Sequence, residues 1–254
     1  MIIIISFIVG YLCKFRLNSK KEIKLSFLLE QLLNFISYSQ YYEDLILFCI
    51  FYDVKNGFYI DVGANDPNYI SVTKAFYLRG WNGINIEPLP NKYELLLKER
   101  IRDINLQIGA GNEEGNYSLF LMGEGSTLTK IYNISNPQIL NIKVKTMSNI
   151  CKKYVPKKKK IQFCKIDVEG FEKNVLLGYD FENYRPKVFC IESTKPATNI
   201  PNYNLWENIL LKNDYSFAYQ FTINRYYVDN RIEGLRERFN LVNKFIKIYK
   251  LINN

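Results

Sequence analysis

Four acidic residues lie at the ends of short apolar runs that are typical of buried strands: Asp61, Glu87, Asp167 and Glu192. Carboxylates in such places can hold ribose hydroxyls, accept a proton from a substrate or bind a hard cation. The chain has no histidine, which excludes histidine general bases, Ser-His-Asp triads and His-ligated zinc. Acid–base chemistry must therefore come from carboxylates, Lys, Tyr, Cys or a metal-bound water.

The turn after the first of these runs spans residues 61–66 (DVGAND) and contains a single glycine. A dinucleotide fingerprint needs further glycines, because they let the backbone approach a pyrophosphate. Asp66 would repel a pyrophosphate, whereas its charge favours a cationic adenosyl ligand. S-adenosylmethionine carries a ribose, an adenine and a sulfonium but no phosphate, and it is therefore the predicted cofactor.

Positions along this turn and the next strand indicate how the cofactor would be bound. We assign Asp61, Gly63 and Asn65 to its methionine end, and Glu87, which ends the second predicted strand, to its ribose hydroxyls. Ser71, in the first turns of the following predicted helix, is a candidate for the methionine carboxylate. A plain helical role explains this serine equally well.

Alternating strands and helices must position these residues. From residue 57 on, the apolar runs predict strands at 58–62, 83–87, 104–108, 161–166 and 187–191, with helices at 69–79 and 92–100. Units of this length predict a parallel sheet with right-handed crossovers, and ligands bind beyond the carboxyl ends of its strands. The expected fold class is α/β: a Rossmann-like, mostly parallel twisted sheet with helices on both faces and an N-terminal helical region.

The last two predicted strands deliver three carboxylates to one edge of the sheet. Asp167 is the first candidate for a general base or an acceptor-positioning group, Glu192 is the second and Glu169 is the third. Glu169 could equally favour the start of the next helix electrostatically. An oxygen-rich Mg²⁺ site at these groups stays open, but we predict no metal ligands.

The two ends of the chain differ in composition from its centre. Residues 1–12 (MIIIISFIVGYL) are apolar but too short to span a bilayer, and basic residues follow up to residue 24. Three interpretations stay open: a peripheral anchor of residues 1–24 on an anionic membrane, a helix packed on the domain, or a non-native leader added by an upstream start codon. Residues 25–56 form the N-terminal helical region, 57–235 the main domain and 236–254 an amphipathic C-terminal helix, expected to be a solvated surface helix.

Several of these segments together resemble one protein family. Residues 61–65 (DVGAN), 80–88 (GWNGINIEP) and 165–172 (KIDVEGFE) are similar to motifs of the FkbM-type S-adenosylmethionine-dependent methyltransferases, and residues 39–44 (SQYYED) resemble an upstream element of one branch. The chain departs from that branch at Tyr42, where glycine is usual. The resemblance implies a Rossmann-like class I methyltransferase that transfers a methyl group to oxygen, often on a sugar or polyketide hydroxyl.

Charge and cysteine content restrict the partners and the compartment. The net charge of +9 includes the run 157–160 (KKKK), which precedes a strand at the edge far from the site and is expected to be a solvated loop. No nucleic-acid-binding motif accompanies the charge, so the expected partner is a small-molecule or glycan acceptor. Five cysteines without a C-x-x-C pair favour buried thiols in a reducing, cytoplasmic compartment, at the inner face of the membrane if residues 1–24 are an anchor.

Two other functions must be separated from a methyltransferase. A nicotinamide-dependent oxidoreductase would use the same kind of sheet, but the turn lacks its glycines. A catalytically inactive, membrane-associated binding module would keep the fold without the chemistry. The complete set of Asp61, Glu87 and Asp167 argues against that module.

Overall fold

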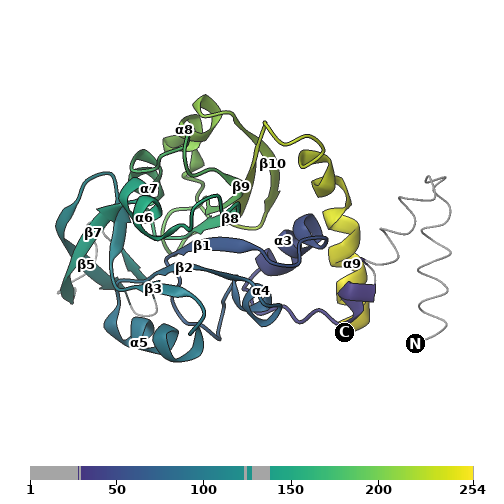
Figure 1. Ribbon diagram of the computed structural model, residues 1–254, viewed down its shortest axis with the longest axis horizontal. Helices are drawn as coiled ribbons and strands as arrows, with labels where there is room; N and C mark the ends of the chain where they lie inside the picture. Colours follow the sequence, from purple (N-terminus) through teal and green to yellow (C-terminus); the bar gives the residue numbers. More distant parts are fainter. Residues whose placement is uncertain (1–27, 29, 123–124, 128–137, 254) are drawn as a thin grey trace.

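A seven-stranded sheet forms the centre of the computed structural model, which describes residues 28, 30–122, 125–127 and 138–253 (Figure 1). The strands lie in the order β10-β11-β9-β8-β1-β2-β3. The pairings from β9 to β3 are parallel, whereas β11 runs antiparallel to both of its neighbours. The prediction of an α/β fold with a mostly parallel sheet is confirmed. The strands are β1 (Phe58–Val62), β2 (Asn82–Ile86), β3 (Ile104–Leu106), β8 (Ile161–Ile166), β9 (Pro186–Glu192), β10 (Tyr215–Phe221) and β11 (Asn224–Asp229).

The order in which the chain adds strands to the sheet reverses between β1 and β8, although the two strands are parallel. After β1 the chain moves outward to β2 and β3, and it later returns to β8 on the other side of β1. Every residue of β1 and β8 is buried, as expected for central parallel strands covered on both faces. Ligands of open α/β sheets bind at such a reversal, beyond the carboxyl ends of the strands.

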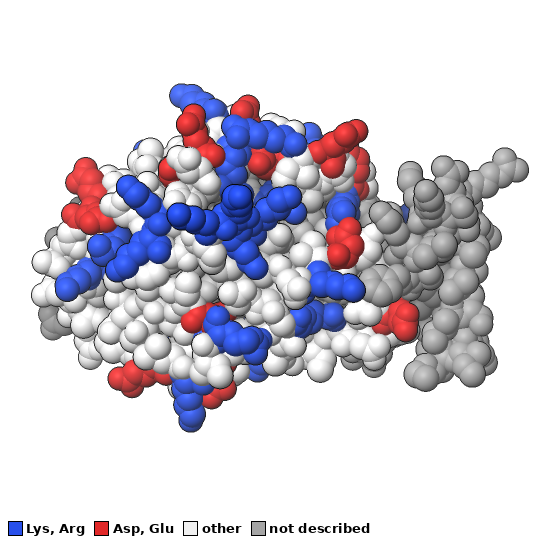
Figure 2. Space-filling view, in the orientation of Figure 1, with Lys and Arg blue, Asp and Glu red and all other residues white. Residues whose placement is uncertain are grey.

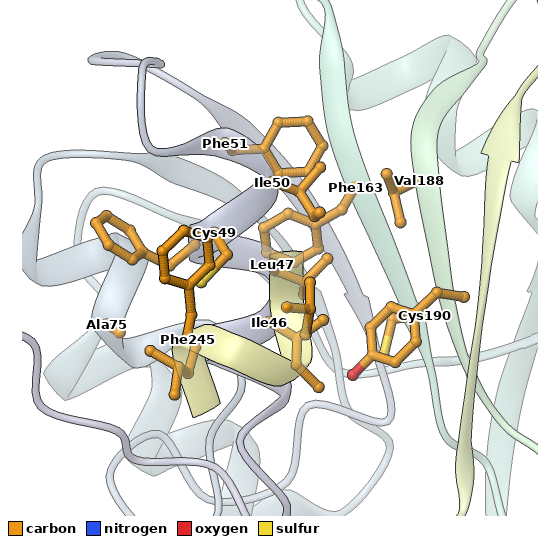
Figure 3. Packing of buried hydrophobic residues seen from close by; sticks show 14 of the residues in the cluster. Ile46, Leu47, Cys49, Ile50, Phe51, Ala75, Phe163, Val188, Cys190 and Phe245 are labelled. Carbon is orange, nitrogen blue, oxygen red and sulfur yellow. The ribbon is translucent and has the colours of Figure 1, made fainter. Parts of the chain in front are cut away.

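Helices cover both faces of this sheet. One face packs with α3 (Glu43–Phe51), α4 (Lys74–Leu78) and α9 (Val242–Asn253). The other face packs with α6 (Met147–Tyr154), α7 (Glu172–Leu177) and α8 (Glu207–Lys212). In Figure 3, Phe51 of α3 lies near Phe163 of β8, with 6.4 Å between the ring centroids. The two helix layers therefore bury the sheet and leave its strand ends for a binding site.

The expectation of a solvated C-terminal helix is wrong for one face of α9. Val242, Phe245, Ile246 and Tyr249 are buried and share a core cluster with α3 and the sheet. Their spacing of three and four residues places them on one side of the helix, and only the packed partner decides whether that side is covered. The proposed domain boundaries at residues 24, 56 and 235 stay predictions.

A second sheet of four strands lies between β3 and β8 in the sequence and was absent from the predicted elements. Its strands have the order β4-β7-β5-β6. Leu119, Ile142 and Val144 form its small core. The second sheet lies at the opposite end of the molecule from α3 and α9 (Figure 1). Its strands are β4 (Gly109–Gly111), β5 (Gly115–Met122), β6 (Gly125–Thr127) and β7 (Ile139–Thr146).

The helix predicted at 69–79 is shorter in the structure. It begins at Lys74, because Ile70 has a φ of +53°, a left-handed conformation that an α-helix does not contain. Ser71 therefore precedes the helix, and its prediction as a residue of the first helical turns is wrong. The next helix, α5 (Pro90–Glu99), begins at a proline, which has no N–H to leave unpaired there. The described residues also form the 3₁₀ helices η1 (Tyr203–Leu205) and η2 (Arg236–Leu241).

The basic and cysteine residues lie largely where they were predicted. Three of the four lysines of the run 157–160 are exposed on the loop before β8, and Figure 2 shows Lys and Arg side chains gathered on the face in view. Four cysteines are buried and free, and the fifth, Cys13, lies outside the described residues. Within the described part of the chain, no helix is both long and apolar enough to cross a bilayer. The predicted anchor at residues 1–24 lies outside that part, so the anchor and the cytoplasmic location stay predictions.

Candidate functional site

A cavity of about 500 Å³ opens at the carboxyl ends of β1, β2 and β8. Its described lining includes the turn after β1, residues 87–89 after β2 and residues 167–169 after β8. The volume lies within the range of about 300–1,000 Å³ that small-molecule sites occupy. Five predicted site residues line it together: Gly63, Asn65, Glu87, Asp167 and Glu169. The other three lie outside the described lining: Asp61, Ser71 and Glu192.

Two residues with left-handed backbone conformations shape the turn after β1. Gly63 has a φ of +75°, and a Cβ at this position would lie 1.9 Å from the carbonyl oxygen of Asp167. Both the φ angle and this close approach require glycine. Asn65 has a φ of +51°, which asparagine tolerates better than most residues. The turn therefore holds the end of β1 against the end of β8.

Glu87 reaches the cavity from the end of β2. Its side chain is 3% exposed; Oε2 accepts a hydrogen bond from the Asn65 N–H at 2.7 Å, and Oε1 accepts one from the Leu89 N–H at 2.9 Å. Burial raises the pKa of Glu87, although these two donors oppose the shift. Each carboxylate oxygen has a second acceptor position. Glu87 can therefore hold the turn and still accept hydrogen bonds from a pair of hydroxyls.

Asp66 is paired with a lysine. Its Oδ2 lies 3.1 Å from Lys92 Nζ, while its Oδ1 accepts hydrogen bonds from the backbone of Asn68 and Tyr69. Burial disfavours ionisation of Asp66, but these donors outweigh it and lower its pKa. The expected repulsion of a pyrophosphate by Asp66 is thus weakened by its lysine partner. Exclusion of a pyrophosphate then depends on the missing glycines.

Lys165, which the sequence predictions left without a role, is a buried cation at the cavity. Its Nζ donates a hydrogen bond to the Gly63 carbonyl oxygen at 2.7 Å, and it lies 3.4 Å from Asp61 Oδ1 and 3.5 Å from Asp167 Oδ2. Burial disfavours its charge, but the two carboxylates raise the pKa of Lys165 well above its ordinary value. In the sequence, Lys165 could have been identified as a site residue by its spacing of two residues from Asp167, because this spacing places both side chains on one face of an extended segment.

Asp61 is not among the described lining residues, but it contacts two neighbouring elements. Its Oδ2 accepts a hydrogen bond from Thr73 Oγ1 at 3.0 Å, at the start of α4, while its Oδ1 pairs with Lys165. Asp61 and Lys165 also face each other in the register between β1 and β8. Asp61 therefore positions the lysine, and its assignment to the methionine end of the cofactor stays a prediction.

Three carboxyl groups converge where β8 and β9 end. Oxygens of Asp167, Glu169 and Glu192 lie within 4.8 Å of one another. Burial, and then the neighbouring carboxylates, raise the pKa of Glu169 to about 7 and the pKa of Glu192 to about 10. Glu192 is 6% exposed, and no group among the described residues donates a hydrogen bond to its Oε2. Burial and the neighbouring carboxylates thus favour the protonated form of Glu192, while the assignment of a base among Asp167, Glu169 and Glu192 stays a prediction.

Ser71 is buried beside Arg100 and is not among the described residues that line the cavity. Its hydroxyl oxygen accepts a hydrogen bond from Arg100 Nη2 at 2.9 Å, and its backbone N–H donates to the Tyr38 carbonyl oxygen at 3.0 Å. Arg100 Nη2 also donates to the Pro67 carbonyl oxygen. Ser71 and the Pro67 carbonyl group are thus joined through Arg100 to the end of α5, and a contact of Ser71 with a methionine carboxylate stays a prediction.

Another part of the lining is apolar. It consists of Leu89, Ile108, Leu119 and Ile142. The last two belong to the second sheet, and Leu89 packs against the core of that sheet. This wall was missed in the sequence because the second sheet was missed. It offers a flat aromatic group a surface without charge.

Comparison with known proteins adds a family to this geometry. A family model described as the methyltransferase FkbM domain matches residues 61–217, which is more than half of the chain. A similar solved structure is that of M. capricolum TrmK in complex with the natural cofactor product S-adenosyl-homocysteine, at 11% sequence identity and a TM-score of 0.39. That similarity covers 85% of this chain and 96% of that chain. No curated protein matches the sequence.

Proposed function

Because the chain belongs to the FkbM methyltransferase family, whose methyl donor is S-adenosylmethionine, we propose that it methylates a hydroxyl oxygen of a carbohydrate or another uncharged hydroxylated acceptor. The observation that carries the proposal is a single cavity that joins Glu87, the turn at Gly63 and the carboxylates of Asp167 and Glu169. These groups can bind the methyl donor and accept a proton from the acceptor hydroxyl at one edge of the sheet.

The residues around the cavity fit S-adenosylmethionine. Glu87 keeps acceptor positions for the ribose hydroxyls, and the wall formed by Leu89, Ile108 and Ile142 suits the adenine ring. The turn at Gly63 lies between this region and Asp167. When bound, the cofactor supplies a methyl group that its sulfonium makes electrophilic.

Asp167 is the group that we assign to the acceptor hydroxyl. Its carboxylate lines the cavity and lies 3.5 Å from Lys165 Nζ, which stays protonated and fixes the carboxylate in place. In this role a carboxylate oxygen of Asp167 accepts the proton of the acceptor hydroxyl. General base catalysis of this kind typically contributes about 10²–10⁴-fold to the rate.

Glu169 and Glu192 have separate roles beside Asp167. Neutral Glu192 can donate a hydrogen bond to the Asp167 carboxylate or to an acceptor oxygen, because its pKa is raised to about 10. Glu169 lines the cavity, and its pKa of about 7 makes its charge depend on pH in the neutral range. The raised pKa of Glu192 supports a role as a hydrogen-bond donor more than its role as the second candidate base.

The charge around Asp167 supports an uncharged acceptor. Lys165 already pairs with two carboxylates, Asp61 and Asp167, and Glu169 adds a further acidic group. A phosphate or carboxylate next to the reacting hydroxyl would be repelled here. A sugar hydroxyl avoids this repulsion, and a nucleic-acid acceptor does not.

The proposal is tested with methyl-labelled S-adenosylmethionine and a panel of neutral glycosides, amino sugars and sugar phosphates. Label is expected on a neutral hydroxylated compound, with a loss of about 10²–10⁴-fold in kcat in Asp167→Asn. Calorimetry with S-adenosyl-homocysteine should show that this variant still binds the cofactor product. Transfer to amines alone would overturn the assignment of oxygen as the acceptor, and cofactor binding without any transfer would favour an inactive binding module.

A chelator separates the metal option within the same assay. Asp167, Glu169 and Glu192 are the described residues that could ligate Mg²⁺. We expect unchanged transfer after treatment with EDTA. Loss of transfer that Mg²⁺ restores would instead show that these carboxylates hold a metal.

A further inference from the structure

We infer that Gln40 is a cofactor-binding residue that contacts the amino-acid end of S-adenosylmethionine through its side-chain amide. Gln40 is exposed and lines the cavity. Among the described lining residues it is the only one that precedes β1, and it lies outside the matched family range of residues 61–217. No role was assigned to it from the sequence.

The loop that carries Gln40 is held by a buried carboxylate. Asp44 is 0% exposed and accepts hydrogen bonds at 2.6–2.8 Å from four groups that belong to residues 37–45. These donors are the Ser37 and Ser39 hydroxyls and the Tyr38 and Leu45 backbone N–H groups. Burying a carboxylate is costly unless it is satisfied in this way. The loop therefore has a defined conformation before any ligand arrives.

A second set of contacts joins this loop to the body of the protein. Glu43 accepts hydrogen bonds from the Tyr41 N–H at 2.8 Å and from Asn224 Nδ2 at 2.6 Å, which connects the loop to β11. Tyr42 has a φ of +61°, so the position where glycine is usual in the related branch keeps the left-handed conformation with a tyrosine. These contacts place the backbone on either side of Gln40 at the cavity.

The same loop is attached to the wall of the cavity. The Ser71 N–H donates to the Tyr38 carbonyl oxygen at 3.0 Å, and residues Tyr69 and Ile70, just before this bond, line the cavity. Gln40 thus belongs to the part of the wall that follows the turn after β1. The apolar wall, of which Leu119 and Ile142 belong to the second sheet, is another part of the lining of the same cavity.

This arrangement gives the cavity two chemically different ends. The adenine suits the apolar wall, and the ribose suits Glu87, so the amino-acid end of the cofactor extends toward the turn at Gly63 and the Gln40 loop. That end carries an ammonium and a carboxylate together. A glutamine amide offers two N–H donors and one carbonyl acceptor, and it can therefore bind both groups without adding a net charge.

Two related compounds test this contact directly. S-adenosyl-homocysteine contains the amino-acid group, and 5′-methylthioadenosine lacks it but keeps the adenine, the ribose and the sulfur. In Gln40→Ala we expect S-adenosyl-homocysteine to bind about tenfold more weakly by calorimetry, while 5′-methylthioadenosine binds as in the unchanged protein. Asn91→Ala is the matched control, because Asn91 is an exposed amide that lines the cavity next to the Glu87 region. Its effect should be the same for both compounds.

The outcomes separate this inference from the identity of the cofactor. Equal weakening of both compounds in Gln40→Ala would show a structural role for Gln40 and overturn the inference. Unchanged binding of S-adenosyl-homocysteine in that variant would also overturn it, while leaving the cofactor assignment intact. If the unchanged protein bound neither compound, the cofactor assignment itself would fail and this inference with it.

Discussion

Asp44 and the cluster of Asp167, Glu169 and Glu192 have very different surroundings in this protein. Asp44 is buried and receives four hydrogen bonds from its own loop. Asp167, Glu169 and Glu192 bring three carboxyl groups within 4.8 Å of one another, and Glu192 Oε2 receives no hydrogen bond from the described residues. Both Asp44 and this cluster are partly or fully buried, yet only Asp44 has its carboxylate oxygens hydrogen-bonded by several donors of the chain.

The difference indicates what each group does. A buried acceptor that the chain satisfies completely stabilises the conformation of its donors, here the loop with Gln40. A cluster whose acceptor positions are incompletely used, and which borders a cavity, keeps hydrogen-bonding capacity for a ligand. Four experiments test whether Asp44 has a structural role and the cluster of Asp167, Glu169 and Glu192 a role in ligand binding or catalysis.

The largest effect on stability is expected for Asp44→Ala. The change leaves the donors of the loop unpaired in the interior, and it should lower the free energy of unfolding by about 3 kcal/mol or more. Urea denaturation measures the loss. The control is Asp167→Ala, whose side chain is 38% exposed and which should lose about 1 kcal/mol or less. Equal losses in the two variants would remove the distinction.

Glu87 has both a structural role and a role in cofactor binding, so its replacement should lower both the stability and the affinity for the cofactor. Glu87→Gln replaces one acceptor oxygen by an NH₂ group that faces a backbone donor, either Asn65 N–H or Leu89 N–H. We expect a loss of about 1–2 kcal/mol in stability and about tenfold weaker binding of S-adenosyl-homocysteine. Denaturation and calorimetry on the same sample measure the two effects. Weaker stability with unchanged affinity would assign Glu87 to the structural group.

Glu192 should make stability depend on pH. Its pKa is near 4.5 in the unfolded chain and about 10 in the folded protein, so the folded state binds the additional proton between these values. Its contribution to stability is therefore complete below about pH 4.5 and is lost as pH rises toward 10. Glu192→Gln mimics the neutral acid and should be more stable than the unchanged protein at pH 9 by about 1–3 kcal/mol. Parallel stability curves for the two proteins between pH 6 and pH 9 would contradict this.

The smallest effect concerns Glu169 and the charge of the cofactor. Because burial raises its pKa to about 7, Glu169 gains a negative charge as pH rises through neutrality. The cationic S-adenosylmethionine should then bind up to about fivefold better relative to the neutral S-adenosyl-homocysteine at pH 8 than at pH 6. Calorimetry at the two pH values gives this ratio. A ratio that changes equally in Glu169→Gln would show that another group is responsible.

Strong local patterns were sufficient to predict the centre of the fold. The strands predicted at 58–62 and 161–166 have the observed bounds of β1 and β8, because buried parallel strands are continuous apolar runs. The length of the α4 helix was overestimated, since the hydrophobic pattern does not indicate that Ile70 has a left-handed backbone conformation. The second sheet was missed because its strands are not continuous apolar runs: β7 alternates between exposed and more buried residues along its length.

The site was predicted less completely than the fold. Gly63, Asn65 and Glu87 were recognised because a strand end followed by a turn has a known place in α/β sheets. Lys165 and Gln40 were given no role, although both lie in segments that resemble family motifs, because only the folded chain shows that their side chains line the cavity. The hydrogen bond of Ser71 with Arg100 was not predicted, because Arg100 is distant in the chain.

The sequence alone determined the chemical types that are present: carboxylates at strand ends, a single glycine in the first turn and no histidine. The order of apolar runs also determined the central parallel strands. Only the tertiary structure decided which carboxylates accept hydrogen bonds from backbone donors, which pair with Lys165 and which have a raised pKa. The reason is physical: ionisation and hydrogen bonding depend on burial and on neighbours a few ångströms away, and folding brings those neighbours from distant parts of the chain.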